Sequence, residues 1–383
     1  PREKGSMAVG ESVLAAFAVA VGAVATSDPG RISPQTAMAV GLLAAVVGGM
    51  RLIISPPLSV HETDLFGKTA IVTGGNSGVG KETVRVLAKW GATVILACRD
   101  VEKGEKAKAE ILGSLPKRSR GSVLVWCLDL ADFSSVRRFC SRFRDSGRPL
   151  HMLINNGGVR HNFLQVTTDG IEEHYQVNHL SHVLLTMELL PMRRIPEPSA
   201  PPICQHPELG DPPAAVRSSA PSRIVHVSSS AHAFGEIEAR AYGAEVLNKD
   251  KAVFEMSMKN RLEGVYGDTK LMQVVFSEEL QSRLKAIAPG VESFSVHPGF
   301  VATNFGGGDT RWLQTMLVLT RPLLARSANQ GAMSVVYAAT SSKVKGLGGG
   351  YISDCKVVKR GAISKGEDAR WLWEESLRIL GLP

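Results

Sequence analysis

A short apolar stretch that leads directly into a glycine-rich turn constrains the fold of this chain most strongly. Lys68–Thr73 has the composition of a buried strand, and Gly74–Gly80 (Gly-Gly-Asn-Ser-Gly-Val-Gly) follows it without a break. Apolar residues then recur at helical spacing, at Val84, Leu87 and Ala88. Gly74 permits a tight turn, and Gly78 and Gly80 allow the backbone and the start of a helix to approach a pyrophosphate. A strand, glycine turn and helix in this order predict a dinucleotide-binding unit rather than an ordinary turn.

Further strands and helices alternate along the chain after this unit. Apolar runs predict strands at Thr93–Ala97, Ser122–Cys127, Leu150–Ile154 and Arg223–Val227, and another before His297. A helix is predicted from about Ser134 to Phe143. Alternating units of this length imply a parallel sheet with helices on both faces. The predicted fold class is therefore α/β, a doubly wound parallel sheet of the Rossmann type, forming one domain over residues 61–383.

Two hydrophobic stretches precede the predicted domain. Val13–Ala25 contains no charged residue, and Ala37–Ile54 is interrupted only by Arg51. A transmembrane helix needs roughly 17–25 apolar residues, so the second stretch qualifies if Arg51 reaches the interface. Two buried core helices are a weaker interpretation, because both stretches are apolar on all sides. We therefore expect residues 1–60 to attach the protein to a membrane, through one or two spans.

The first stretch also fits a secretory signal. Arg2 and Lys4 would form its basic region, and Ala23-Val24-Ala25 resembles a cleavage site. This alternative favours a lumenal domain, but the five cysteines include no Cys-x-x-Cys pair and their number is odd. Free thiols indicate a reducing compartment, so a cytosol-facing domain is expected. Cys98 and Cys127 end apolar strands and are predicted to be small buried hydrophobic residues.

The net charge of +8 is compatible with anionic lipid, a phosphorylated cofactor or nucleic acid as a partner. Lys103–Lys108 mixes both signs, and Lys117–Arg120 has no interleaved aromatic residues, so nucleic acid is not expected. His179 and His182 are three apart on a predicted helix, where packing or hydrogen bonding explains them better than a metal does. No metal site is predicted.

The residues after the second and third strands bear on the cofactor. An acidic residue usually follows the second strand when the cofactor lacks a 2′-phosphate, but Cys98-Arg99-Asp100 occurs here. Arg99 can pair with a 2′-phosphate and favours NADP over NAD, while Asp100 weakens that inference. Lys81, just past the glycines, adds a second cation. Asp129, after the third strand, is a candidate for contact with the adenine amine.

Tyr266 and Lys270 are the candidate proton-transfer pair. Spacing four places them on one face of a helix, one turn apart. An ammonium near a phenol favours the phenolate and lowers its pKa from about 10, which allows proton exchange with an alcohol or carbonyl. Alone, this spacing is also typical of an ordinary helix surface; its significance depends on the nucleotide site upstream.

Taken together, these motifs resemble the short-chain dehydrogenase/reductase family from about Asp64 to the C-terminus. The matching residues are Thr73-Gly74-x-x-x-Gly78-x-Gly80, Asn155-Asn156-Gly157-Gly158, Asn178, Val227-Ser228-Ser229, Tyr266-x-x-x-Lys270 and Pro298-Gly299. The chain is most similar to the membrane-anchored retinol dehydrogenase branch. That similarity rests on Ala97–Asp100, Asp169–Glu172, Val177–Leu180, Tyr351–Cys355 and the hydrophobic N-terminus.

The resemblance implies roles for individual residues. Ser229 would polarise a carbonyl oxygen, Tyr266 would donate or remove the proton, Lys270 would hold the nicotinamide ribose, and Asn178 would join a water-borne proton relay. Pro298 and Gly299 would lie in a turn at the nicotinamide end, and Thr303 in the same turn is a candidate for contact with a phosphate. The cofactor-binding residues implied are Gly74, Asn76, Ser77, Gly78, Val79, Gly80, Arg99, Asp129, Leu130, Asn156, Gly157, Tyr266, Lys270, Pro298, Gly299 and Thr303.

Three departures from the family pattern stand out. Gly158 replaces the usual alanine, and Thr269 replaces the usual serine before the lysine. Residues 191–222 form a Pro-rich insertion, which is better explained as a tolerated surface loop than as a site for a proline-reading partner. The apolar segment Arg311–Leu324 fits either a lid over a lipophilic substrate or a helix packed on the core.

The resemblance and the residues together predict an NADP(H)-dependent oxidoreductase that interconverts a lipophilic alcohol, such as retinol, and its aldehyde or ketone. A steroid, a prenol or a fatty aldehyde fits the same chemistry. A nucleotide-binding membrane adaptor without turnover is the alternative from another class. The expected partners are a lipophilic substrate and membrane lipid, with homo-oligomerisation left open. The expected location is the endoplasmic reticulum membrane.

Overall fold

The computed structural model describes residues 57–161, 163–190, 222–237, 264–301, 325–358 and 366–383. Nearly all of them belong to one compact unit, Leu58–Asp309 with Arg326–Pro383. The second unit, Pro1–Pro57 with Thr310–Ala325, has only its boundary residues among those described. The predicted membrane segments, the Pro-rich insertion up to residue 221 and the segment Arg311–Leu324 therefore lie outside the described residues. Within the described ranges, no helix is long and apolar enough to cross a bilayer.

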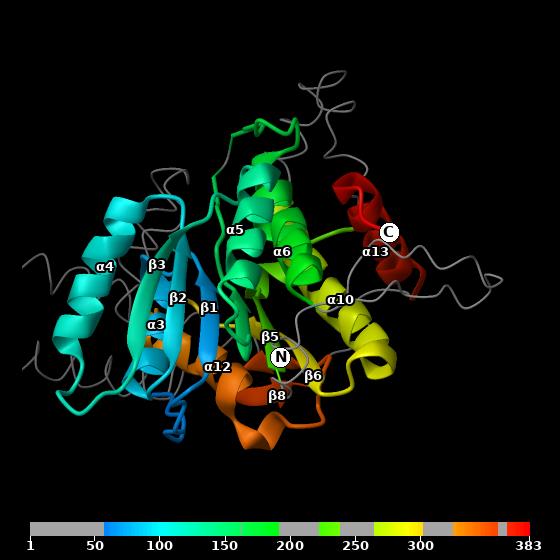
Figure 1. Cartoon of the computed structure of the whole chain (residues 1–383). Coiled ribbons are helices and arrows are strands. Elements are labelled where there is room, and N and C mark those ends of the chain that lie inside the picture. The colour runs from blue at the N-terminus through cyan, green and yellow to red at the C-terminus, as the bar shows by residue number, and fades with distance from the viewer. Residues whose placement is uncertain (1–56, 162, 191–221, 238–263, 302–324, 359–365) are drawn as a thin grey trace, which may run out of the picture. The chain divides into compact units, whose positions relative to one another are not determined.

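A single mixed sheet organises the described unit (Figure 1). Its strands are β1 (Thr69–Thr73), β2 (Thr93–Cys98), β3 (Ser122–Cys127), β4 (Met152–Asn155), β5 (Ser222–Val227), β6 (Val291–His297), β7 (Tyr351–Ser353) and β8 (Lys356–Val358). They are arranged in the order β3-β2-β1-β4-β5-β6-β7-β8. All neighbours are parallel except β7 and β8, which are antiparallel. The order reverses between β1 and β4, which is the switch point where doubly wound sheets open a crevice.

The predicted Rossmann-type sheet is confirmed. Each predicted strand is present, and its ends differ from the prediction by no more than two residues. Prediction works well here because central parallel strands are covered on both faces and therefore have nearly continuous apolar sequences. The fourth strand is displaced by one residue at its carboxyl end, because Asn155 still pairs in register with His226 of β5.

Helices cover both faces of the sheet, as Figure 1 shows. The described helices are α3 (Gly78–Lys89), α4 (Val101–Ser114), α5 (Phe133–Asp145), η1 (Tyr175–Leu180), α6 (Ser181–Leu189), η2 (Ser230–Phe234), α10 (Gly264–Ile287), α12 (Ala328–Thr340), η4 (Ser342–Val344) and α13 (Gly366–Leu380). The labels η1, η2 and η4 denote a π-helical turn and two 3₁₀ turns. Asp100 and Asp132 accept hydrogen bonds from backbone N–H groups at the starts of α4 and α5, which satisfies otherwise unpaired donors.

The core consists of two apolar clusters, one on each face of the sheet. Ile71 of β1 and Ile95 of β2 belong to the cluster that includes α5, α6, α10 and α13. Their neighbours Val72 and Leu96 belong to the cluster that includes α3 and α12. Successive side chains of a strand point to opposite faces, so each central strand contributes to both clusters. This leaves the carboxyl ends of the strands as the edge at which loops can form a site.

The prediction that Cys127 is buried is wrong, whereas Cys98 is buried as expected. Cys127 is the last residue of β3, which has a neighbouring strand on only one side, so its thiol is exposed. Cys98, Cys127, Cys140 and Cys355 are free thiols, and Cys204 lies outside the described residues. Burial raises the pKa of Cys98 to about 11 and that of Cys140 to about 12. These two buried thiols therefore stay protonated at neutral pH.

Candidate active site

The glycine turn between β1 and α3 forms the first part of the site. Gly74 has a φ of 64°, in the region that favours glycine. A Cβ atom at Gly80 would lie 2.4 Å from the carbonyl oxygen of Gly74 and 2.5 Å from Nδ2 of Asn156. The turn therefore closes only with glycine at position 80. Its shape fits the backbone cradle that a pyrophosphate needs at the start of a helix.

The start of α3 keeps polar groups available for an anion. Ser77 occupies the N-cap position, yet its side chain makes no capping hydrogen bond. Ser77 is exposed, and Asn76, Gly78 and Val79 are half-buried around it. Because α3 has no acidic residue in its first turn, the positive end of the helix dipole is not compensated from within the helix.

A hydroxyl behind the turn links it to the loop after β4. The side chain of Thr73 accepts hydrogen bonds from the backbone N–H of Asn156 at 2.9 Å and of Gly157 at 2.8 Å. Asn156 in turn donates from Nδ2 to the carbonyl oxygen of Thr73 at 2.8 Å. A Cβ atom at Gly157 would lie 2.8 Å from Cδ1 of Leu130, so these residues are in close contact. The structure therefore brings Gly80, Leu130, Asn156 and Gly157 together at the crevice.

At the end of β2, Arg99 is exposed, and no hydrogen bond or ion pair joins its guanidinium to another described residue. Asp100 instead caps α4: it accepts from the backbone N–H of Lys103 at 3.0 Å and pairs with the Lys103 ammonium at 3.1 Å. These bonds to Lys103 lower the pKa of Asp100. The Asp100 carboxylate, which weakened the inference of a 2′-phosphate contact, is thus bound to Lys103 at the start of α4.

Two other predicted cofactor residues are engaged by the protein. Lys81 forms an ion pair with Glu110 of α4, so the expected second cation near the phosphate is neutralised. Asp129 accepts a hydrogen bond from the backbone N–H of Ala131 at 2.9 Å, which fixes the turn after β3. Asp129 remains only half-buried at the carboxyl edge. Arg99 is consequently the better candidate for a phosphate contact.

Asn178 lies in the π-helical turn η1, a local irregularity that often marks functional sites. Its Oδ1 accepts from the backbone N–H of Val159 at 2.8 Å. Its Nδ2 donates to the carbonyl oxygen of Val159 at 3.0 Å and to Oγ1 of Thr269 at 3.1 Å. Thr269 donates to the carbonyl oxygen of Tyr266 at 2.9 Å. The side chain of Asn178 therefore ties the loop after β4 to the helical turn that carries the tyrosine.

Tyr266 and Lys270 lie in the first turns of α10. The Lys270 ammonium is 5.5 Å from the centre of the Tyr266 ring, and the Arg160 guanidinium is 5.6 Å from it. Lys270 donates to the carbonyl oxygen of Val227 at 3.0 Å and to Oε1 of Gln273 at 3.1 Å. Burial lowers the pKa of Lys270 to about 7. Arg160 and, when protonated, Lys270 thus place positive charge near the phenol ring, and the predicted lowering of the pKa of Tyr266 stays a prediction.

The three serines after β5 differ in their surroundings. Ser228 is buried and donates to the carbonyl oxygen of Lys270 at 2.7 Å, so its hydroxyl is used in the fold. Ser230 is exposed. Ser229 is half-buried, and its Oγ accepts from the backbone N–H of Ala231 at 3.2 Å while capping η2. Ser229 keeps its O–H proton for another acceptor and remains the candidate that can polarise a carbonyl.

The turn after β6 completes this edge. Gly299 has a φ of 87°, and a Cβ atom there would lie 2.8 Å from Nη1 of Arg326. Pro298 is half-buried, and Thr303 lies outside the described residues. His297 accepts from the backbone N–H of Ser230 at 3.1 Å, which joins β6 to η2. Burial lowers the pKa of His297 to about 4, so the ring is a neutral acceptor.

Sequence reasoning missed Thr73, His182 and Gln273 as contributors to the site. His182 was assigned only to packing or hydrogen bonding, and its ring indeed bonds to protein atoms at both nitrogens. His179 bonds to Ser376 at 2.9 Å. Among the described residues, no group of three His, Cys, Asp or Glu side chains is placed to hold a metal. Gln273 follows Lys270 by three residues, and this spacing, which places the two side chains on one face of a helix, was the sequence signal that could have identified it.

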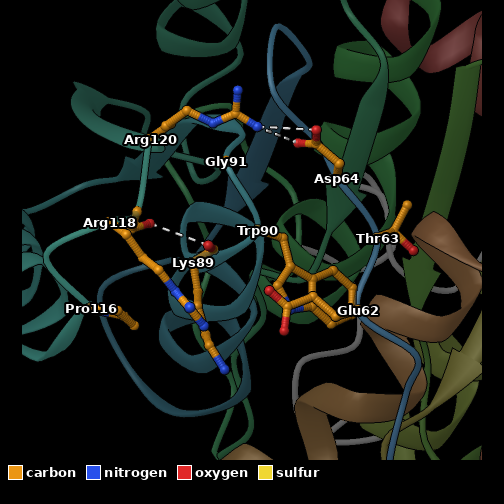
Figure 2. Close-up of a pocket in the computed structure, with 10 residues that line it drawn as sticks. Glu62, Thr63, Asp64, Lys89, Trp90, Gly91, Pro116, Arg118 and Arg120 are labelled. Carbon is orange, nitrogen blue, oxygen red and sulfur yellow. Dashed lines mark hydrogen bonds and ion pairs between the residues drawn. The ribbon is translucent and has the colours of Figure 1, made fainter.

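Figure 2 shows the side chains that line a cavity of about 290 Å³, among them Asp64, Trp90 and Arg120. Gly91 and Arg120, which line it, lie two residues before the starts of β2 and β3, so the cavity lies at the amino ends of these strands. Asp64 accepts hydrogen bonds from Arg120 at 3.0 and 3.1 Å across its rim. Doubly wound sheets bind ligands at the carboxyl ends of their strands. The cavity is therefore separate from the candidate site.

Comparisons with known proteins agree with this geometry. Residues 68–196 match the family model described as short chain dehydrogenase. The chain is 36% identical to human retinol dehydrogenase 11, covering 89% of this chain and 95% of that protein. It is 36% identical to mouse retinol dehydrogenase 12, covering 82% and 87%. A solved structure from Mycobacterium paratuberculosis is 27% identical with a TM-score of 0.56, covering 83% of this chain and 95% of that one.

Proposed function

The chain belongs to the short-chain dehydrogenase family, in the retinol dehydrogenase branch, and we propose that it interconverts a lipophilic alcohol and its aldehyde or ketone with NADP(H). One observation carries this proposal most directly. The buried Lys270 ammonium lies 5.5 Å from the Tyr266 ring, at the carboxyl edge of a sheet whose glycine turn fits a pyrophosphate. A proton donor and a nucleotide cradle therefore open on the same crevice.

The glycine cradle supports the cofactor assignment because a Cβ atom at position 80 would fill it. Gly74–Gly80, Asn156, Gly157, Pro298 and Gly299 would hold the nucleotide. When bound, the reduced cofactor supplies the hydride. Tyr266 supplies the proton to the carbonyl oxygen, and Ser229 polarises that oxygen through its O–H. General acid–base help of this kind contributes about 10²–10⁴-fold in rate.

Lys270 has three N–H groups, of which two donate to Val227 and Gln273. The third remains for the phenol or for the nicotinamide ribose. Its positive charge stabilises the phenolate that forms when Tyr266 gives up a proton. The buried setting strengthens this effect because little water screens the charge.

Arg99 supports NADP(H) as the cofactor. Its guanidinium is exposed after β2, and the neighbouring Asp100 carboxylate is engaged by Lys103. A guanidinium recognises phosphate through paired, charge-assisted hydrogen bonds. This arrangement favours a cofactor that carries a 2′-phosphate.

Two observations support a lipophilic substrate. The relatives with the highest similarity reported above are retinol dehydrogenases by name. The apolar stretch Ala37–Ile54 is long enough to span a bilayer and would bring membrane lipids within reach of the domain. We propose a retinal-like aldehyde as the first substrate to test, with attachment to the endoplasmic reticulum and a cytosol-facing domain. Cell fractionation with protease protection tests the attachment and topology.

The activity is tested with the full-length protein purified in detergent. NADPH consumption is followed with all-trans-retinal, a steroid ketone, a prenal and a long-chain fatty aldehyde. We expect consumption with at least one of them, and its loss in Tyr266→Phe while NADPH still binds. Cofactor binding without consumption of NADPH on any substrate would instead support the nucleotide-binding adaptor.

A further inference from the structure

Gln273 lies between Lys270 and Asn178 and bonds to both. Its Oε1 accepts from the Lys270 ammonium at 3.1 Å, and its Nε2 donates to the backbone carbonyl oxygen of Asn178 at 2.6 Å. The exposed fraction is 3% for Lys270, 1% for Gln273 and 0% for Asn178. A single amide therefore spans two residues of the candidate site in a region without solvent access.

The carbonyl oxygen of Asn178 is filled by side-chain donors. Nε2 of Gln273 approaches it at 2.6 Å, and Nδ1 of His182 approaches it at 3.1 Å. A carbonyl oxygen has two lone pairs, so both are used. Gln273 and His182 therefore both hold this backbone carbonyl in place.

We propose that Gln273 is a positioning residue that holds the Lys270 ammonium in its charged form and in register with Asn178. The inference deepens the proposed oxidoreductase function and rests on it. In the described part of the chain no carboxylate pairs with Lys270, so its acceptors there are the carbonyl of Val227 and the amide of Gln273. Loss of the amide removes one of the two groups that compensate the buried charge.

The charged and titratable groups around the pair are few. Tyr266 faces Lys270 from the same helix, and His182 faces it from α6. Burial lowers the pKa of His182 to about 4, so its ring is neutral at physiological pH. Arg160, in the loop after β4, faces the Tyr266 ring from 5.6 Å. None of these three residues supplies a negative charge to Lys270 while the phenol is protonated.

Two substitutions of similar size change the pKa of Lys270 in opposite directions. Gln273→Met keeps the volume but removes the acceptor, so the ammonium is less favoured and the pKa of Lys270 falls. Gln273→Glu places a carboxylate beside the ammonium, so that pKa rises. Gln273→Asn is one methylene shorter, cannot bridge both partners, and should resemble the Met variant. A role limited to packing would not give shifts of opposite sign.

The experiment measures the titration of Lys270 directly and through activity. Lysine labelled with ¹³C and ¹⁵N is followed by NMR from pH 5 to 10 in the full-length protein, with the Lys270 signal assigned by its absence in Lys270→Met. In parallel, kcat/KM for NADPH-dependent aldehyde reduction is measured over the same range. We expect the midpoint of the Lys270 titration to move down by about one pH unit in Gln273→Met and up in Gln273→Glu. The alkaline limb of the kcat/KM profile should move in the same direction as that midpoint in each variant.

Gln281→Met is the matched control. Gln281 is buried on the same helix and accepts a hydrogen bond from the backbone N–H of Ser293 at 2.7 Å, away from Lys270. We expect this variant to lose stability without moving the Lys270 titration. Shifts of the same sign in the Met and Glu variants, or no shift in either, would overturn the inference. Opposite shifts in a protein that reduces no aldehyde would support the inference and reject the proposed function.

Discussion

The hydroxyl of Thr73 lies 2.9 Å from Nε2 of His182, which joins the end of β1 to α6 across 109 residues of sequence. The opposite ring nitrogen, Nδ1, lies 3.1 Å from the carbonyl oxygen of Asn178. Because a carbonyl oxygen only accepts, Nδ1 carries the proton and Nε2 accepts from Thr73. The two oxygen lone pairs of Thr73 then receive Asn156 and Gly157. One neutral histidine therefore connects the glycine turn, the loop after β4 and Asn178.

Thr73→Val tests this connection. The substitution leaves Nε2 of His182 and the backbone N–H of Gly157 without their partner in a buried setting. The backbone N–H of Asn156 keeps its second acceptor, the carbonyl oxygen of Ile154 at 3.0 Å. We expect the free energy of unfolding to fall by about 2–4 kcal/mol, since an unpaired buried polar group costs about 1–3 kcal/mol. Urea denaturation measures the loss.

The matched control is Thr83→Val, because the buried Thr83 hydroxyl donates within its own helix, to the carbonyl oxygen of Val79 at 2.8 Å. We expect a loss of less than about 1 kcal/mol there. A double-mutant cycle with His182→Phe should give a coupling of about 0.5–3 kcal/mol between positions 73 and 182. Additive effects would show that the two side chains do not act together.

Gly80→Ala should prevent closure of the glycine turn. Its Cβ atom would lie 2.4 Å from a backbone carbonyl oxygen, a contact that only movement of the turn can relieve. We expect loss of measurable NADPH binding, followed by nucleotide fluorescence, and a loss of stability of more than about 2 kcal/mol.

Gly113→Ala in α4 serves as the comparison for Gly80→Ala. A Cβ atom there meets nothing within 4 Å, and alanine favours a helix over glycine by up to about 1 kcal/mol. Unchanged NADPH binding and equal or higher stability are therefore expected. Similar losses in the two variants would contradict the cradle assigned to Gly80.

Arg99→Asp should change the cofactor preference. The substitution removes a cation at the end of β2 and adds a negative charge, which repels a 2′-phosphate but not a 2′-hydroxyl. We expect the Kd for NADPH to rise by at least about 10-fold, because a charge-assisted hydrogen bond contributes about 1.5–3 kcal/mol. Isothermal titration with NADPH and NADH measures both constants.

Arg118→Asp makes the same change of charge at the cavity at the other edge of the sheet. It should leave the ratio of the two constants unchanged. An equal loss of affinity for NADPH and NADH in Arg99→Asp would remove the argument for a 2′-phosphate contact.

The sheet and the proton-transfer pair could be predicted from sequence because each has a local signal. Buried parallel strands are continuous apolar runs, and Tyr266 and Lys270 have the spacing of one helical turn. The roles of His182 and Gln273 could not be predicted in the same way. Their partners are distant in sequence, and a single polar residue on an apolar helix face is usually unremarkable. The exposure of Cys127 depended on strand order, which no local pattern specifies.

The charged residues after the glycine turn and after β2 also show what a local sequence pattern cannot predict. Their positions after the glycine turn and after the second strand predicted Lys81 and Arg99 as cations near the phosphate. Lys81 pairs with Glu110, whereas Arg99 is exposed and forms no ion pair with another described residue. The difference arises from α4, whose Glu110 lies within reach of α3. Likewise, Asp100 became a helix cap because α4 begins at the next residue. Pairing between helices decides which charges remain available to a ligand.

Lys270→Met should stabilise the protein while it abolishes aldehyde reduction. Burial lowers the pKa of Lys270 from its ordinary value of 10.5 to about 7, so folding works against the charged form. Below pH 7 both the folded and unfolded states are protonated, and the full cost of burial is present. Between pH 7 and 10.5 the unfolded state binds more protons, so the stability of the wild-type apoprotein rises with pH.

The increase in the free energy of unfolding caused by Lys270→Met should therefore be largest near pH 6 and disappear towards pH 10. Each unit of pKa displacement corresponds to about 1.4 kcal/mol, so a gain of about 2–4 kcal/mol is expected at low pH. Urea denaturation of both proteins without nucleotide, at pH 6, 8 and 9.5, measures it. Lys285→Met, an exposed position on the same helix, is the control for loss of a positive charge. A gain that stays constant with pH would mean that the ammonium is not the group whose burial opposes folding.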